Sequence, residues 1–263
     1  MARERRNVFG EAVDQYANAR PGYPAQLIDD VLAYGDPVGD VLEVGAGTGK
    51  ATIAFAARGV TLTCLEPDPR MAARLEIECA SFPDVSIVIA GLEQWVSPSP
   101  FDALIAAQSW HWVDPGRRWD LAHHAVRTGG TIALFWNKYV VGDDELRGEL
   151  EQIDRRFDVD NGSSPNGVTT ATFPEEIVLE EGWPAYDLAS DARFEDLVSR
   201  RYHRTQTYST ATYLDLLAST SSYRIVDDSA RDALMVEVAS VIEQSGGELE
   251  LSLITDLFLA HTT

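Results

Sequence analysis

The stretch Val41-Leu42-Glu43-Val44-Gly45-Ala46-Gly47-Thr48-Gly49 decides the fold class of this 263-residue chain. A short, mostly apolar strand leads into a turn with alternating glycines, and a helical pattern follows to about Arg58. Glycine lacks a Cβ atom and tolerates positive φ, so such a turn lets the backbone approach a ligand closely. The N-terminus of the next helix adds free N–H groups and a partial positive charge. The stretch therefore predicts a strand, a ligand-binding turn and a helix.

The same alternation of strand and helix continues to residue 136. Apolar strands are predicted at 60–65, 85–89, 101–107 and 131–136, helices at 69–80 and 115–127, and a turn at Thr128-Gly129-Gly130. Short apolar strands separated by helices indicate parallel pairing in a sheet covered on both faces. Because crossover connections are right-handed, the pattern predicts an α/β, doubly wound, Rossmann-like sheet.

We expect residues 1–263 to form a single domain with four parts. Residues 1–37 would form an N-terminal helical cap around Arg20-Pro21-Gly22-Tyr23-Pro24, and residues 38–137 the binding core. Residues 138–200, with a helix at 143–157, would be an insertion that forms a lid. Residues 201–263 would complete the sheet, with a strand at 201–208, helices at 210–219 and 229–244, and the last strand or strands within 248–260.

The composition excludes several classes of partner. Lys and Arg total 21 against 42 for Asp and Glu, and the net charge of −21 would repel a nucleic-acid backbone. No stretch has the length and apolarity of a transmembrane helix, and no apolar segment follows the basic N-terminus as in a secretory signal. Cys64 and Cys79 are unclustered, which favours a reducing compartment over disulfides or a zinc site. We therefore expect a cytoplasmic protein with no nucleic-acid, membrane or metal partner.

Three positions narrow the identity of the ligand. Lys50 stands where a dinucleotide-binding G-x-G-x-x-G motif has its third glycine. Glu43, at the end of the first strand, suits an ammonium group better than a pyrophosphate. Glu66, at the tip of the second strand, can accept hydrogen bonds from both ribose hydroxyls, a feature that nicotinamide enzymes share. A P-loop is excluded, because Val44 and Ala51 occupy positions that need glycine and Ser or Thr.

These motifs resemble those of class I S-adenosylmethionine-dependent methyltransferases of the small-molecule type, the group that includes trans-aconitate methyltransferase. The resemblance covers nearly the whole chain and implies a seven-stranded sheet with S-adenosyl-L-methionine as cofactor. In such enzymes the glycine turn lies under the methionine part of the cofactor, and two acids hold its amino group and its ribose. The resemblance assigns the amino group to Glu43 and the ribose to Glu66. It assigns the glycine turn to Gly45, Ala46, Gly47 and Gly49.

Further binding residues follow from the same resemblance. Pro67 and Met71 match positions that flank the adenine, and Gly91 and Leu92 match its edge. Many relatives carry Asp where Gly91 stands, so backbone groups of Gly91 and Leu92, or Glu93, must serve here. Gln108 would lie beside the methionine end of the cofactor. Tyr16 and Arg20 belong to the cap, where Arg20 would pair with the cofactor's carboxylate.

The implied chemistry is in-line methyl transfer to a small molecule that the sequence does not identify. The enzyme mainly has to align nucleophile and methyl group and to exclude water. His111, at the carboxyl end of the fourth strand, is the candidate catalytic base, and shaping the pocket is its alternative role. Trp110 and Trp112 would wall the site or face the sulfonium, with simple packing as the alternative.

Two other functions stay open at this point. A nicotinamide-dependent oxidoreductase is the rival enzyme, and a cofactor-binding protein without catalytic activity is the rival non-enzyme. No particular side chain is required for methyl transfer, so the sequence does not exclude the second. A homodimer is retained as a hypothesis for the oligomeric state, which the sequence does not determine.

Overall fold

The computed structural model describes residues 13, 17, 19–35, 38–159 and 178–263. The chain divides into two compact units. Unit 1 comprises Met1–Pro21, Asn137–Glu176 and His203–Ile254, and unit 2 comprises Gly22–Trp136, Ile177–Tyr202 and Thr255–Thr263. Of the predicted N-terminal cap, most of residues 1–19, including Tyr16, lie outside the described residues.

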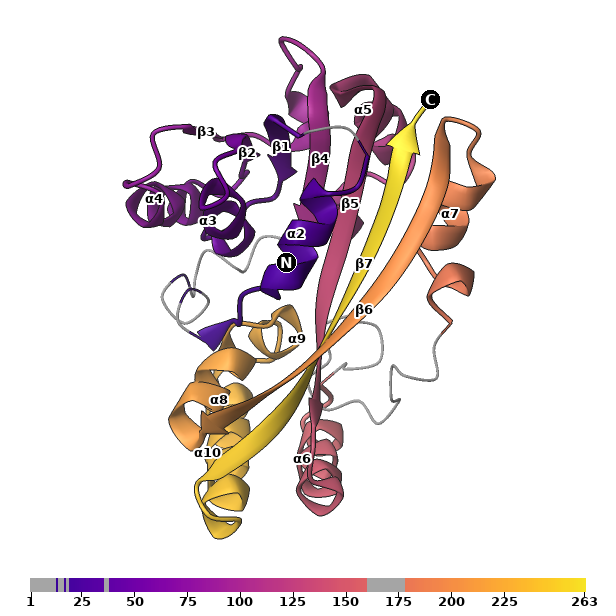
Figure 1. The fold of residues 1–263 in the computed structure, drawn as a ribbon. Coiled ribbons are helices and arrows are strands. Elements are labelled where there is room, and N and C mark those ends of the chain that lie inside the picture. Colours follow the sequence, from indigo (N-terminus) through magenta and orange to yellow (C-terminus); the bar gives the residue numbers. More distant parts are fainter. Residues whose placement is uncertain (1–12, 14–16, 18, 36–37, 160–177) are drawn as a thin grey trace. The chain divides into compact units, whose positions relative to one another are not determined.

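The described strands form one seven-stranded sheet in the order β3-β2-β1-β4-β5-β7-β6. β1 to β5 pair in parallel, and Figure 1 shows the β7 arrow pointing opposite to that of β6. The order reverses between β1 and β4, which is where a doubly wound sheet binds its ligand. This topology confirms the predicted Rossmann-like fold. The strands are β1 Asp40–Val44, β2 Thr61–Leu65, β3 Val85–Val88, β4 Phe101–Ala107, β5 Val126–Val141, β6 Phe194–Ser209 and β7 Glu248–Thr262.

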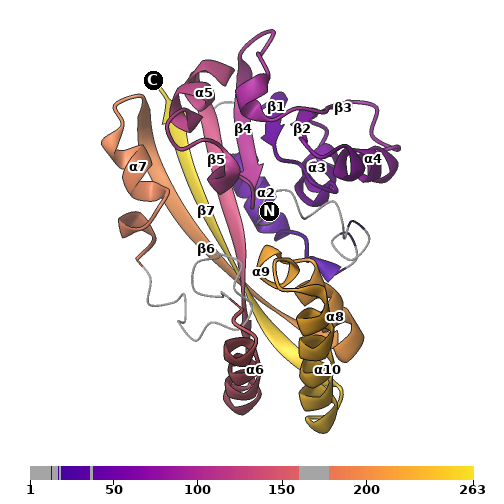
Figure 2. The same cartoon turned by 180° about the vertical axis from the view of Figure 1, so that it is seen from behind.

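In unit 2 both faces of the sheet are covered. Successive residues of a strand point to opposite faces, and accordingly Val41 and Leu42 belong to two different apolar clusters. The Val41 cluster includes residues of α2 (Ala25–Leu32), α3 (Lys50–Ala56) and α4 (Pro69–Glu78). The Leu42 cluster includes residues of α5 (Arg118–Ala125) and α7 (Ala185–Ser190). Figures 1 and 2 view the sheet from its two sides.

Unit 1 has an apolar core of its own. Its helices are α6 (Asp144–Arg156), α8 (Thr210–Ala218), α9 (Ser221–Arg224) and α10 (Asp228–Gln244). Leu150, Tyr213 and Val238 from three of these helices pack together with residues of β5, β6 and β7. No helix in the described ranges has the length and apolarity needed to cross a bilayer.

The prediction of a turn at Thr128-Gly129-Gly130 between a helix and a strand is wrong. These residues lie inside β5, at an irregularity where Phe101 pairs with Val126 but Ala103 pairs with Thr131. Gly129 has a φ of 71°, and a Cβ on Gly130 would lie 2.5 Å from Cγ1 of Val126. Glycine is needed here because the extra residues of the bulge fold back on the strand.

Other boundaries differ from the expectations. β6 begins at Phe194, inside the segment assigned to the insertion, and β5 extends to Val141. The short helices α7 and α9 were not predicted, because four to six residues are too few to show a helical period. The role of residues 138–200 as a lid stays a prediction.

Candidate functional site

The strand register brings three predicted site segments, which follow β1, β2 and β4, to one end of the sheet. Val44 pairs with Leu65, and Ala107 pairs with Phe135. The residues that follow Val44, Leu65 and Ala107 therefore emerge at the carboxyl ends of β1, β2 and β4, whereas Trp136, which follows Phe135, lies within the longer strand β5. We call residues 43–49 and 66–71 the turn edge, and residues 108–112, 118–119, 136 and 183 the aromatic edge. Both belong to unit 2.

The glycine turn folds back against the end of β2. Gly45, Gly47 and Gly49 have φ values of 70°, 60° and 94°, which L side chains rarely adopt. The N–H groups of Gly45 and Ala46 donate to the carbonyl of Leu65 at 2.8 and 3.1 Å. A Cβ on Gly45 would lie 2.5 Å from Cβ of Ser109. The close approach of the Ser109 segment therefore requires glycine at position 45.

Glu66 is buried where the turn meets β2. Its Oε2 accepts a hydrogen bond from the N–H of Gly47 at 2.8 Å, and its Oε1 accepts from the N–H of Asp68 at 2.9 Å. Burial raises the pKa of the Glu66 carboxyl, against the effect of these two backbone hydrogen bonds. A carboxylate has roughly four lone-pair sites, so this one can accept further bonds from a pair of hydroxyls.

Glu43 faces α3 and is almost completely buried. Its Oε2 accepts a hydrogen bond from Oγ1 of Thr52 at 2.6 Å, while its Oε1 has no partner among the described residues. Burial raises the pKa of the Glu43 carboxyl to about 7. The carboxyl is therefore partly protonated at neutral pH. Its contact with a cofactor amino group stays a prediction.

The predicted adenine region consists mainly of backbone and apolar groups. Met71 is buried in the first turn of α4, whereas Pro67 is exposed. Gly91 has extended backbone before the 3-10 helix η3 (Leu92–Gln94), and the side chain of Leu92 lies in the apolar core. Oε1 of Glu93 accepts from the N–H of Asp114 at 2.9 Å. Gly91 and Leu92 can therefore offer a ligand only their backbone groups, and their contact with an adenine stays a prediction.

Gln108 turns the chain out of β4 in a left-handed conformation. Its φ is 62°, and its N–H donates to the carbonyl of Phe135 at 2.9 Å. A non-glycine residue in this region stores about 1 kcal/mol or more of strain, and such residues cluster at functional sites. The turn directs the chain into the 3-10 helix η4 (Trp110–Trp112), which carries His111.

His111 is a neutral hydrogen-bond donor in this geometry. Its Nδ1 accepts from Nε1 of Trp136 at 3.3 Å, which leaves the proton of the neutral ring on Nε2. Burial, and secondarily the charge of Arg118, lowers the pKa of His111 to about 4. A general base needs a lone pair directed at the acceptor, whereas the Nδ1 lone pair of His111 is directed at Trp136. The contacts therefore favour donation from Nε2 over the predicted base role.

Two of the predicted cofactor-binding residues belong to the cap. Arg20 belongs to unit 1, where its guanidinium donates to Oγ of Ser219 at 2.9 Å and to the Ser219 carbonyl at 3.2 Å. Tyr16 lies outside the described residues. Contacts of Tyr16 and Arg20 with a cofactor stay predictions.

Sequence reasoning missed Arg118, Trp119 and Trp183. The Cζ atom of Arg118 lies 5.0 Å from the ring centre of Trp183 and 5.8 Å from that of Trp119. Trp183 in turn meets Trp136 edge to face, with 5.1 Å between ring centres. No local motif announces these residues, because α5, β5 and the segment before α7 bring them together only in three dimensions.

Known proteins similar to this chain are methyltransferases. The methyltransferase domain family matches residues 41–130. An uncharacterized methyltransferase of Mycobacterium bovis is 36% identical over 199 residues, which are 74% of this chain and 76% of that protein.

Solved structures of methyltransferases share the fold. A structure of a putative type II methyltransferase from Anaeromyxobacter dehalogenans has a TM-score of 0.64 at 18% identity, over 92% of this chain and 97% of that chain. A structure of phosphoethanolamine N-methyltransferase 2 of Haemonchus contortus, in complex with S-adenosyl-L-methionine, has a TM-score of 0.51 at 16% identity. The match covers 98% of this chain and 57% of that chain. None of these similarities singles out the trans-aconitate branch.

Proposed function

The chain belongs to the class I S-adenosylmethionine-dependent methyltransferases, and on that premise we propose that it methylates a small molecule by in-line displacement. The observation that carries this proposal is the pairing of the glycine turn with Glu66. The turn leaves no room for a side chain at position 45, and the buried Glu66 carboxylate is fixed by two backbone N–H groups. A nucleoside with two vicinal hydroxyls fits that carboxylate.

The turn edge fits S-adenosylmethionine by the chemistry of its groups. Glu66 would accept from the ribose hydroxyls, and the backbone from Gly45 to Gly49 would lie against the methionine part. Oε1 of Glu43, which has no partner in the part of the chain that the structure describes, offers an acceptor for the amino group, directly or through water. The bound cofactor supplies a methyl group already activated by the sulfonium.

The aromatic edge would receive the acceptor. Gln108 follows β4 directly, so His111 and Trp136 lie beside the place expected for the methionine end. The indole rings would exclude water, which would otherwise compete as a nucleophile. They would also hold the acceptor in line with the methyl group. His111 would orient the acceptor through its Nε2–H group. Its role as a base is the competing proposal, and the tautomer of the His111 ring distinguishes the two roles.

Isothermal titration calorimetry with S-adenosylmethionine, S-adenosylhomocysteine and NAD tests the proposal. We expect the first two to bind and NAD not to bind. Glu66→Ala should weaken S-adenosylhomocysteine binding roughly tenfold to a hundredfold, because charge-assisted hydrogen bonds are lost. Glu76→Ala removes an exposed carboxylate of α4 and is the matched control, expected to bind as the wild type does.

Each rival function has a distinct outcome. Binding of NAD without S-adenosylmethionine would replace the proposal by an oxidoreductase, although the similar proteins offer that reading no support. Binding of S-adenosylmethionine without methylation of any acceptor in a broad small-molecule screen would favour the cofactor-binding protein without activity.

A further inference from the structure

The aromatic edge contains hydrogen-bond donors for which the described residues offer no acceptor. Nε of Arg118, Nε1 of Trp183 and Nε1 of Trp110 are buried, and none of them has a partner in the described part of the chain. Buried N–H groups are nearly always paired in folded proteins. Three unpaired donors in neighbouring side chains therefore point to an acceptor that the chain itself does not supply.

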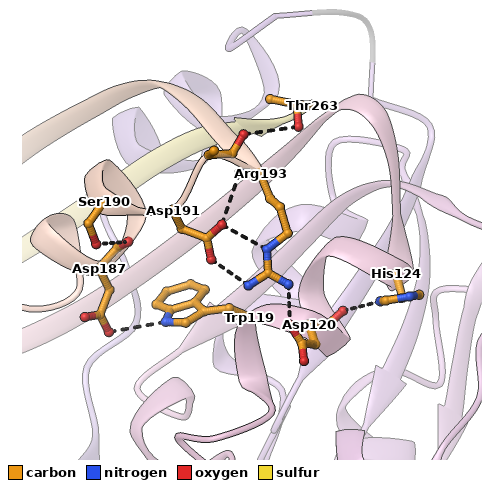
Figure 3. A network of polar contacts seen from close by, with 9 residues as sticks. Trp119, Asp120, His124, Asp187, Ser190, Asp191, Arg193 and Thr263 are labelled. Atoms are coloured by element: carbon orange, nitrogen blue, oxygen red, sulfur yellow. Dashed lines mark hydrogen bonds and ion pairs between the residues drawn. The ribbon is translucent and has the colours of Figure 1, made fainter.

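Arg118 is the strongest of these donors. Its side chain is only 13% exposed, and its carboxylate neighbour is Asp187, with Nη2 and Oδ2 3.9 Å apart. That distance is too long for a hydrogen bond. The same Oδ2 already accepts from Nε1 of Trp119 at 3.2 Å, as Figure 3 shows. A guanidinium has five N–H donors, so most of its capacity is unused.

Two other acidic side chains near Trp119, Asp191 and Asp120, already pair with a different arginine. Asp191 accepts two hydrogen bonds from the Arg193 guanidinium, at 2.9 and 2.6 Å, and Arg193 also pairs with Asp120. Figure 3 shows this group beside Trp119. An open depression of about 550 Å³, lined in part by Arg118, Trp119, Tyr186 and Asp187, adjoins the Arg118 side chain.

The surroundings strengthen any anion contact. Rings of Trp119 and Trp183 flank the guanidinium, and Trp136 links Trp183 to His111. Apolar walls lower the local dielectric constant, so a charge pair is worth more there than in water. His111 adds its Nε2–H as a further donor, and the positive charge of Arg118 helps to keep that ring neutral.

We propose that the methyl acceptor carries a planar carboxylate, bound by Arg118 together with the N–H groups of Trp183 and His111. A guanidinium matches a carboxylate with two parallel hydrogen bonds, and the tryptophan rings suit a flat, aromatic body. This inference rests on the proposed function, since it assigns a substrate class to the same site.

The probes are 4-hydroxybenzoate and 4-hydroxybenzamide, which differ in the carboxylate alone. Each is titrated calorimetrically into protein saturated with S-adenosylhomocysteine. We expect the benzoate to bind with a Kd at least about tenfold lower than that of the amide. Arg118→Met, which keeps length and packing, should remove this preference. Arg117→Met removes an exposed charge one residue away and should retain it.

Two further variants keep the test decisive. Asp187→Asn removes the neighbouring carboxylate but can still accept from Trp119, so it should lower the Kd for the benzoate. A purely structural Arg118–Asp187 pair predicts no such gain. If Arg118→Met fails to fold, Arg118→Lys, which keeps the charge without the planar fork, should reduce the preference about threefold.

The outcomes separate this inference from the proposed function. Equal affinity for the two probes, an unchanged preference in Arg118→Met, or no binding of either probe to the S-adenosylhomocysteine complex would overturn the carboxylate assignment. Absence of S-adenosylhomocysteine binding would instead overturn the proposed function. The two probes would then still be compared on the free protein.

Discussion

The turn edge and the aromatic edge offer a ligand opposite kinds of hydrogen-bonding group. At the turn edge, Glu43 and Glu66 present carboxylate oxygens, and their local partners are Thr52 and backbone N–H groups. At the aromatic edge, Arg118 and Trp183 present buried N–H donors that find no acceptor among the described residues. The first suits hydroxyls and an ammonium group, whereas the second suits an anion. Under the proposed function, the cofactor and the methyl acceptor would therefore meet opposite kinds of group.

The two edges also differ in how the chain builds them. The residues of the turn edge lie close together in sequence, and backbone conformation positions them. Those of the aromatic edge come from the segment after β4 that includes η4, from β5, from α5 and from the segment before α7. Packing among side chains therefore positions them. Substitutions at the turn edge should therefore change the backbone conformation. Substitutions at the aromatic edge should remove individual side-chain contacts.

The largest effect is expected from Gly45→Ala at the turn edge. The substitution forces a side chain into positive φ and to within 2.5 Å of Cβ of Ser109. We expect the free energy of unfolding in urea to fall by roughly 2–4 kcal/mol. The control is Gly59→Ala, where φ is also positive, at 80°, but where the added Cβ would meet no atom of the described residues within 4 Å beyond its chain neighbours. It should cost only about 1–2 kcal/mol. Equal losses would mean that Ser109 imposes no constraint on the turn.

The next effect is a pH dependence that originates from Glu43. Its pKa is about 7 in the folded protein and 4.5 as the ordinary value, so the folded state binds the proton more tightly. The contribution to stability is therefore full below pH 4.5 and is lost as the pH rises through 7. Relative to Glu43→Gln, the wild type should lose roughly 2–3 kcal/mol of unfolding free energy between pH 5 and 8. Parallel pH curves for the two proteins would show that Glu43 is ionised throughout.

The smallest effect concerns the hydrogen bond between Trp136 and His111. Long-range ¹H–¹⁵N NMR spectra should show His111 as the neutral Nε2–H tautomer from pH 8 down to about pH 5, since its pKa is about 4. His111→Gln assigns the signal. Trp136→Phe should cost about 1 kcal/mol of stability and produce a mixture of tautomers. An Nδ1–H tautomer in the wild type, or titration near pH 6.5, would restore the base role of His111.

Much of the turn edge was predictable from local chemistry. Positive φ at Gly45, Gly47 and Gly49 follows from a turn between a strand and a helix, and the position of Glu66 follows from the end of β2. The orientation of Glu43 toward Thr52 was not predictable, because it depends on how α3 packs on the sheet. Its raised pKa follows from that burial.

The sequence by itself determined the alternation of strands and helices, the parallel sheet and the glycine turn, because backbone sterics and apolar periodicity are local properties. Only the tertiary structure decided the bulge around Gly129, the pairing of Trp136 with His111 and the place of Arg118 between Trp119 and Trp183. These features depend on strand register and on packing between segments distant in the chain. Such contacts leave no pattern in the local sequence, since the same residue types would serve equally well as ordinary core or surface.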